Sequence, residues 1–285
     1  MNNITASEVN KLRKATGAGI MDCKNALVES NGDFDLAIEN LRKKGQKVAA
    51  KRADRESSEG AVIATVNNKN DNGVIISLNC ETDFVGKNES FVTLAKEISE
   101  IALGCDSIDQ LFNSNFDDKM SVKEKLTEQT GVIGEKIEIG SFVKIKSNFV
   151  GSYIHAGNKI ATLVGLSESF EGCGEVAKNI AMQAAAMNPI ALDENGVSKE
   201  VIEKEIEIAK EQLRSEGKPE NMLENIAKGK LKKFFKENTL INQAYIKDSK
   251  ISVINYLHSI NQNCSISDFK RLSLIHISEP TRPFH

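Results

Sequence analysis

The sequence is poor in aromatic residues and has no strong charge bias. It contains no Trp and 3 Tyr in 285 residues, so aromatic platforms for stacking single-stranded nucleic acid are not expected. The net charge of −3 argues against general affinity for nucleic acid or membranes, which usually needs a broad basic surface. No apolar run approaches the roughly 20 residues that span a bilayer. We therefore expect neither nucleic acid nor membrane as a partner.

Cysteine is sparse and scattered. The 5 cysteines form no Cys-x-x-Cys pair and occur at Cys23, Cys80, Cys105, Cys173 and Cys264. This spacing is typical of reduced cytosolic thiols and contains no metal-site pattern. Residues 1–4 also lack the charged-then-apolar layout of a secretory signal. The sequence therefore predicts cytoplasmic localisation.

A chain of this length can form two domains or slightly more. Residues 1–45 have the pattern of a small three-helix module, in which Thr5 or Ser7, Asp22 and Asp33 cap the helices and Gly45 ends the third. The core of so small a unit is marginal, so we expect it to depend on docking to another element.

The first two helices are separated by Thr16-Gly17-Ala18-Gly19. A phosphate-binding loop usually follows a strand and, in the P-loop form, ends in Lys-Ser/Thr, whereas this segment follows a helix and lacks that ending. A tight interhelical turn is the better interpretation. The adjacent Ile20 and Met21 fit either a local staple or a contact patch for a partner.

Residues 46–59 are basic and then polar, with no sustained apolar stripe. They indicate a helical or flexible linker with a solvated charged surface, and nucleic-acid contact is the minor alternative.

Residues 60–146 form the first half of a predicted core. Strand-like runs at 61–66 and 74–78 flank a turn cluster, and a helical pattern follows from Phe91 to Ala102. Between the second strand and this helix lies Cys80-Glu81-Thr82-Asp83-Phe84-Val85-Gly86-Lys87-Asn88. Turns normally favour small or polar residues, so Phe84 is unusual there. It either tucks under its own helix or is offered to a partner.

The pattern then repeats, which indicates an internal duplication. A second hairpin-plus-helix unit occupies residues 147–194, and residues 237–274 return to complete this second half of the core. Residues 195–236 interrupt it with two amphipathic helices joined by a sharp turn, which predicts an inserted antiparallel helical hairpin. The predicted class is α+β, with largely antiparallel sheets and helices on one side. Residues 275–285 continue no pattern and have the character of a non-native tail.

Patterns of enzyme chemistry are weak. His155, at a predicted hairpin turn, could be a metal ligand, a base or a surface contact, but no neighbouring His or Cys supports a metal. There is no Gly-x-Ser-x-Gly elbow, and Glu81 and Asp83 are the local candidates for a carboxylate pair. We predict no catalytic, cofactor-binding or metal-binding residues. A protein-interaction role fits the separate modules better.

Three motifs resemble those of the bacterial elongation factor Ts family, and the first two together are highly specific. They are Leu12-Arg13-x-x-Thr16-Gly17-Ala18-Gly19-x-Met21-Asp22-Cys23-Lys24-x-Ala26-Leu27, Glu81-Thr82-Asp83-Phe84-Val85 and Gly151-Ser152-Tyr153-x-His155. The resemblance covers nearly the whole chain to about residue 274. It implies a ubiquitin-associated-like N-terminal module, a two-part core and a coiled-coil hairpin.

The resemblance also implies a partner and a mechanism. Family members promote GDP release from elongation factor Tu, and the turn matching Thr82, Asp83, Phe84 and Val85 enters the partner's nucleotide-binding domain. Arg13, Ile20 and Met21 match N-terminal contact positions, although position 20 is often Met in the family. His155 matches a contact of the core. Phe84 is then expected to wedge near the magnesium site of elongation factor Tu, with no nucleotide or metal bound by this chain. The alternative is a ubiquitin-associated-type scaffold without exchange activity.

Overall fold

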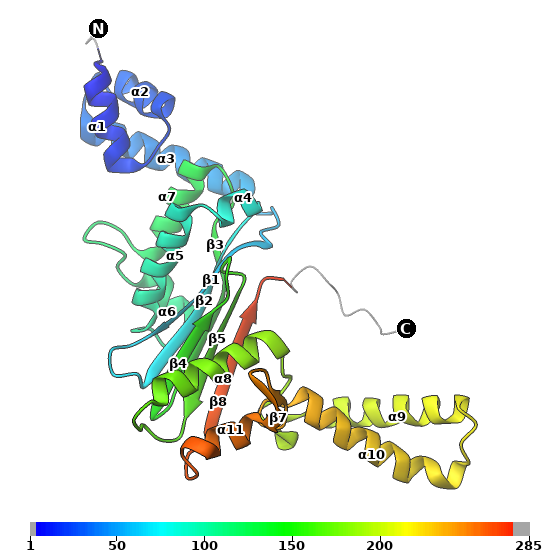
Figure 1. The fold of residues 1–285 in the computed structure, drawn as a ribbon. Helices are drawn as coiled ribbons and strands as arrows, with labels where there is room; N and C mark the ends of the chain where they lie inside the picture. Colours follow the sequence, from blue (N-terminus) through cyan, green and yellow to red (C-terminus); the bar gives the residue numbers. More distant parts are fainter. Residues whose placement is uncertain (1–3, 276–285) are drawn as a thin grey trace.

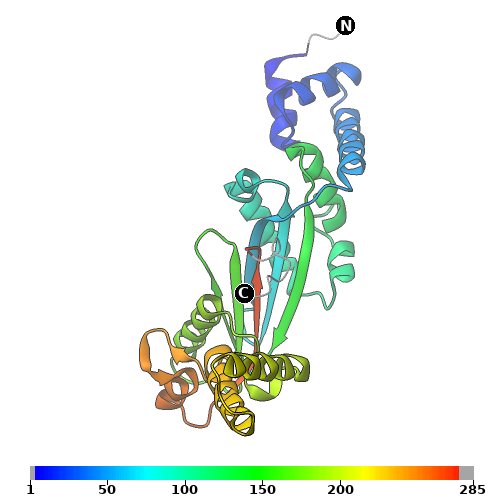
Figure 2. The ribbon, with the colours of Figure 1, turned by 90° about the vertical axis from the view of Figure 1, so that its right-hand side faces the viewer.

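The computed structural model describes residues 4–275 of the chain. A helical unit at the N-terminal end leads into a central body of two sheets, from which a pair of long helices projects (Figures 1 and 2). The mixture of helices with antiparallel sheets confirms the predicted α+β class.

The N-terminal unit consists of α1 (Ala6–Thr16), α2 (Ile20–Glu29) and the first half of α3 (Phe34–Arg52). Thr5 and Glu8 form a capping box at the start of α1, and Asp33 caps α3 through the Leu36 N–H. The helices share a small apolar core that includes Val9, Leu12, Cys23, Ala26, Leu27 and Ala37. Gly17 has a φ of 71° and ends α1 in the left-handed conformation, so the Thr16–Gly19 segment is an interhelical turn.

Two predicted helix boundaries in this region were wrong. Helix α3 passes through Gly45 and continues to Arg52, because Gly45 packs closely against another helix instead of adopting a left-handed cap. Helix α2 begins at Ile20, with Gly19 at its cap position. Asp22 therefore lies within the first turn of α2, where it forms an ion pair with Lys44 of α3. The segment predicted as a linker is thus helical as far as Arg52.

Two three-stranded antiparallel sheets form the body, in the orders β1-β2-β3 and β4-β5-β8. Their strands are β1 (Glu59–Val66), β2 (Asn72–Cys80), β3 (Glu138–Lys146), β4 (Phe149–Ile154), β5 (Ile160–Leu166) and β8 (Ile266–Ser273). In each sheet a hairpin leads into a helix, α5 (Glu89–Ala102) or α8 (Cys173–Met187), before a third strand pairs with the second. The predicted repetition of hairpin-plus-helix units is therefore present in the topology.

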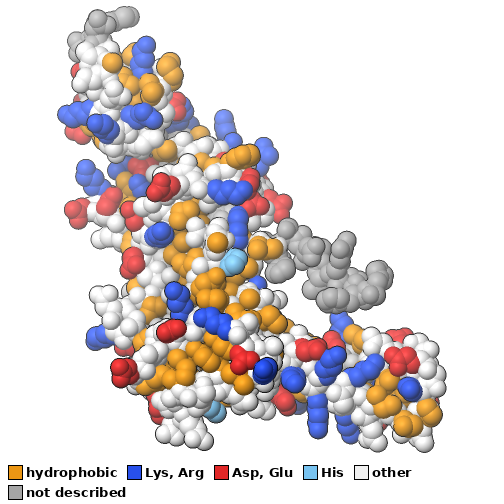
Figure 3. All heavy atoms as spheres, viewed as in Figure 1, with side chains coloured by type: hydrophobic (Ala, Val, Ile, Leu, Met, Phe, Trp, Pro, Cys, Tyr) orange, Lys and Arg blue, Asp and Glu red, His pale blue; other side chains and the backbone are white. Residues whose placement is uncertain are grey.

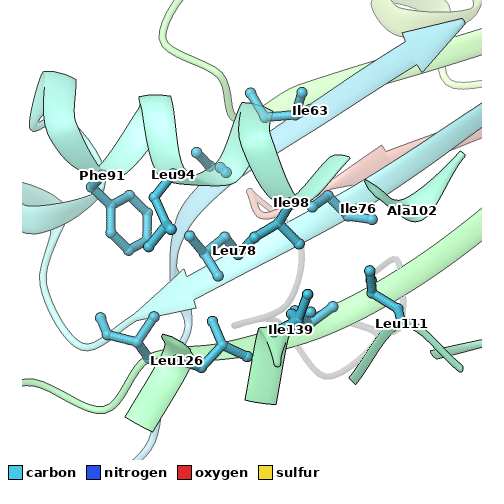
Figure 4. Packing of buried hydrophobic residues seen from close by; sticks show 14 of the residues in the cluster. Ile63, Ile76, Leu78, Phe91, Leu94, Ile98, Ala102, Leu111, Leu126 and Ile139 are labelled. Atoms are coloured by element: carbon cyan, nitrogen blue, oxygen red, sulfur yellow. The ribbon is translucent and has the colours of Figure 1, made fainter. Parts of the chain in front are cut away.

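Alternation along the strands builds separate cores on the two faces of each sheet. In β1, Ala61 and Ile63 face the helices, whereas Val62 packs between the two sheets with Val150 and Leu163. On the helical side of the first sheet, residues at helical spacing in α5 meet β2 and β3 (Figure 4). This core is completed by Leu111 of α6 (Ile108–Asn113) and Leu126 of α7 (Val122–Ile133).

The second half contains the predicted insertion. After a short 3₁₀ turn at Glu194–Gly196, α9 (Lys199–Ser215) and α10 (Glu220–Asn238) lie side by side and extend away from the body (Figure 1). Buried Leu213 and Leu223 lie near the turn between them, and Lys210 Nζ lies 2.6 Å from Glu224 Oε2. The chain returns through β6 (Ala244–Tyr245), β7 (Asp248–Ser252) and α11 (Val253–Ile260) to β8.

The surface is unevenly divided. Hydrophobic side chains gather over the central body on the face in Figure 3, whereas charged side chains cover much of the projecting helices. Within residues 4–275, no helix combines the length and apolar character needed to cross a bilayer. Apart from Ile275, the predicted non-native tail lies outside the described residues.

Candidate functional site

Phe84 lies on a short helix, α4 (Asp83–Gly86), between β2 and α5. Phe84 is 84% exposed, the highest value among the large hydrophobic residues of the described range 4–275. The next residue, Val85, packs against the core of the first sheet, and Gly86 is buried. The short helix thus has an anchored side and an outward side. Phe84 is on the outward side, so the alternative in which it tucks under its own helix is wrong.

Thr82 caps α4 and is itself held by Glu135. The Glu135 carboxylate accepts hydrogen bonds from the Thr82 N–H at 3.0 Å, the Thr82 hydroxyl at 2.6 Å and the Glu81 N–H at 3.1 Å. Thr82 Oγ1 in turn accepts a longer bond from the Val85 N–H. A carboxylate at the start of a helix satisfies N–H groups that the helix leaves unpaired. Glu135 therefore fixes the direction in which α4 leaves the strand.

Glu81 ties the same turn to α3. Its two carboxylate oxygens lie 2.7 and 2.8 Å from Nη1 of Arg52, and Oε1 also accepts the Lys136 N–H at 2.7 Å. The bond from the Lys136 backbone, together with Arg52, lowers the pKa of Glu81 below its usual range. Glu81 is thus an anchor of the turn.

Asp83 has a different partner. Lys87 Nζ donates to Asp83 Oδ2 at 2.6 Å, and this bond lowers the pKa of Asp83 and raises that of Lys87. Glu81 and Asp83 are therefore bound to separate cations and do not form a carboxylate pair. Asp83 stays about half-exposed beside Phe84, so its charge remains available to a partner.

The anchored side of α4 packs against the backbone of β1. A Cβ on Gly86 would lie 3.1 Å from the backbone of Gly60, and Gly60 itself has a φ of 142°. A Cβ on Gly60 would lie 2.0 Å from the Leu78 carbonyl oxygen. The pair of glycines allows the helix to approach the sheet. Nearby, burial is the main cause that raises the pKa of the Cys80 thiol to about 12, so Cys80 is not a thiolate nucleophile at neutral pH.

His155 follows β4 and is exposed. The Tyr153 hydroxyl lies 3.0 Å from His155 Nδ1. The loop after His155 contacts β1, because the Val62 N–H donates to the Asn158 carbonyl at 2.7 Å and Lys159 forms an ion pair with Glu59. Glu59 is followed by Gly60, which contacts Gly86 of α4. The structure therefore brings the His155 turn and the Phe84 turn to the same end of β1.

Arg13, Ile20 and Met21 form a separate exposed group around the α1–α2 turn. Ile20 is 53% and Met21 is 62% exposed at the start of α2, so neither is a buried staple. This turn lies beside the middle of α3, since Asp22 pairs with Lys44 and a Cβ on Gly17 would lie 3.8 Å from Val132 of α7. The predicted contact residues thus fall into two surfaces, one on the N-terminal unit and one on the body.

Sequence analysis missed the residues that hold the turn. Glu135 follows the Gly134 cap of α7, 53 residues from Thr82, and no local pattern marks it. The sequence predicts a solvated basic linker around Arg52, whereas the continuation of α3 brings Arg52 to Glu81. Within the described range 4–275, no group of three or more His, Cys, Asp or Glu side chains is arranged to hold a metal ion.

Comparison with known proteins identifies relatives of this sequence. Residues 81–275 match the family model described as Elongation factor TS. The chain is 64% identical over 274 residues to the elongation factor Ts of Christiangramia forsetii, which covers 96% of this chain and 100% of the relative. The elongation factor Ts of Flavobacterium psychrophilum is 63% identical with the same coverage. That of Amoebophilus asiaticus is 50% identical, covering 94% of this chain and 98% of the relative.

Proposed function

The chain belongs to the elongation factor Ts family and is therefore a translation elongation factor, and from this premise we propose that it binds elongation factor Tu directly and releases its GDP through the turn that carries Phe84. The observation that supports this most is the 84% exposure of Phe84 on a helix whose other side is anchored. A large apolar side chain held in water gains about 2–3 kcal/mol when a partner buries it.

Phe84 acts as a wedge near the magnesium and nucleotide site of elongation factor Tu. Thr82 and Val85 set the direction of the wedge, because one is bound by Glu135 and the other packs on the sheet. Asp83 supplies a charge at the base of the wedge, where a donor on the partner can bind it. An anchored wedge loses little conformational freedom on binding, so more of its burial energy remains to distort the partner.

The release of GDP is a coupling between two ligands of elongation factor Tu. If the factor binds the loosened nucleotide site better than the closed one, it weakens the binding of GDP to elongation factor Tu. GDP then weakens the binding of the factor by the same amount. About 1.4 kcal/mol of coupling changes the affinity tenfold, so a few kcal/mol is sufficient. The factor itself binds no nucleotide and no metal and performs no covalent chemistry. It acts in the cytoplasm, where elongation takes place.

Two exposed regions outside the Phe84 turn contact the same partner. The N-terminal unit, which we assign as ubiquitin-associated-like over residues 1–45, presents Arg13, Ile20 and Met21 to the phosphate side of the nucleotide domain. His155 adds a contact beside Phe84. The remaining divisions are a connecting segment at 46–59, core halves at 60–146 and at 147–194 with 237–274, and a coiled-coil hairpin at 195–236. We keep these divisions as part of the proposal.

The experiment is the release of fluorescent GDP from purified elongation factor Tu, with and without this protein. An increase in the release rate that saturates with factor concentration supports the proposal. Binding without faster release would favour the alternative, a ubiquitin-associated-type scaffold. Absence of binding would contradict the proposal and would also favour the scaffold, which would then bind another partner.

A further inference from the structure

Helices α3 and α7 cross with their backbones in contact at two glycines. A Cβ placed on Gly131 of α7 would lie 2.4 Å from the Cα of Gly45 in α3, closer than side-chain and backbone carbons pack. A Cβ on Gly45 would lie 3.5 Å from the Cα of Gly131, an ordinary contact. The crossing therefore requires glycine at position 131 and favours a small residue at 45.

Backbone conformation does not explain either glycine. Neither Gly45 nor Gly131 has a positive φ, and both lie within regular helix. Glycine in a helix interior costs about 1 kcal/mol relative to alanine, so close approach is the remaining reason for it. The buried residues of α3 are Ala37 and Gly45. The contact at Gly45 therefore holds the second half of this helix against the body.

Both helices also lead to the Phe84 turn. The last residue of α3, Arg52, binds Glu81, and the chain leaving α7 supplies Glu135 to Thr82. Helix α3 is thus held at two points along its length. The exposed α1–α2 turn lies beside the first of these points, since Asp22 pairs with Lys44 and a Cβ on Gly17 would lie 3.8 Å from Val132 of α7.

We propose that Gly131, Gly45 and Arg52 are positioning residues that set the location of the Ile20–Met21 surface relative to Phe84. The inference rests on the proposed function, in which both surfaces contact one molecule of elongation factor Tu. We call the N-terminal unit together with α3 the arm. Once Phe84 has docked, an arm in its fixed position presents Met21 to the same partner at high effective concentration, whereas a displaced arm does not. Preorganisation of the arm also reduces the entropy lost in the complex.

The test is a set of double-mutant cycles in the fluorescent-GDP release assay, measured below saturation with the full chain. Met21→Ala and Phe84→Ala are each made in wild type and in Gly131→Ala, which forces α3 away from α7. We expect Met21→Ala to slow release about fivefold in wild type but less than about twofold in Gly131→Ala, because the arm is already displaced. Phe84→Ala should slow release by a similar factor in both backgrounds.

The matched control is Gly229→Ala, on α10, where an added Cβ meets nothing within 4 Å. Its release rate should equal that of wild type, and Met21→Ala should retain its full effect in that background. If circular dichroism shows that Gly131→Ala does not fold, Arg52→Met replaces it, since this variant removes the second anchor without a clash.

An independent readout is the distance between spin labels at Met21→Cys and Lys87→Cys in the free factor. Gly131→Ala should shift or broaden this distance, whereas Gly229→Ala should not. Equal effects of Met21→Ala in wild type and in Gly131→Ala would overturn the inference, as would an unchanged label distance. If the wild-type protein does not accelerate GDP release, the proposed function is wrong. If the wild-type protein is active but the effects of Met21→Ala and Gly131→Ala are additive, only the positioning role is contradicted.

Discussion

The carboxylate of Glu135 binds both the backbone N–H and the hydroxyl of Thr82, the residue that caps the helix carrying Phe84. The two residues belong to different segments, since Glu135 follows α7 and Thr82 follows β2. Long-range contacts of this kind allow a four-residue helix to keep one orientation, because so short a helix has little stability of its own.

Glu135→Gln should loosen the turn without unfolding the body. The amide keeps one acceptor oxygen but loses the charge and presents N–H groups to the Thr82 donors. Hydrogen bonds to a charged group contribute about 1.5–3 kcal/mol, so we expect about tenfold faster hydrogen exchange at the α4 amides. Native-state hydrogen exchange measures this. Glu97→Gln, at an exposed position on α5, is the control and should leave those amides unchanged.

Gly60→Ala should destabilise the whole protein. Its Cβ would lie 2.0 Å from the Leu78 carbonyl oxygen, at a φ of 142° that other residues rarely adopt. We expect the free energy of unfolding to fall by roughly 3 kcal/mol. Urea denaturation measures the change. Gly229→Ala, in open space on α10, should instead raise it by up to about 1 kcal/mol, and a loss similar to that of Gly60→Ala would contradict the account.

The depressed pKa of Glu81 predicts a pH dependence with a definite sign. The unfolded chain takes up a proton on this carboxyl at a higher pH than the folded protein does, so stability rises with pH through the carboxyl range. The contribution of Glu81 to the free energy of unfolding is fully present above its ordinary pKa of 4.5. It is lost as the pH falls through the lower pKa of Glu81 in the folded protein. Urea unfolding of wild type and Glu81→Gln between about pH 3 and 6 isolates it. The difference in stability between the two proteins should shrink as the pH falls, and a constant difference would refute the assignment.

Local patterns predicted most of the fold. Alternation in residues 61–66 and helical spacing from Phe91 to Ala102 identified β1 and α5, because each pattern places apolar side chains on the face that is buried. The repeated order of hairpin and helix likewise predicted the second sheet. The ends of α2 and α3 were predicted wrongly, since Asp22 and Gly45 make tertiary contacts that outweigh their usual roles at helix ends.

The site was only partly predictable. Composition left Phe84 undecided between a buried and an exposed position, and the choice depends on Val85 and Gly86 anchoring the other side of α4. The supports Glu135 and Arg52 were not predicted, because each acts on a residue far away in the sequence. The meeting of the His155 and Phe84 turns also depends on pairing between the two halves of the body.

The central claim is that exposed Phe84 drives nucleotide release, and Phe84→Ala tests it most directly. Stopped-flow release of fluorescent GDP from elongation factor Tu is measured with the variant at saturating concentration, beside Ile260→Ala as a matched exposed apolar truncation on α11. Loss of about 2 kcal/mol of contact in the loosened complex should slow release about 30-fold for Phe84→Ala, with unfolding midpoints unchanged. Ile260→Ala should match wild type. Equal release rates for Phe84→Ala and wild type would contradict the account.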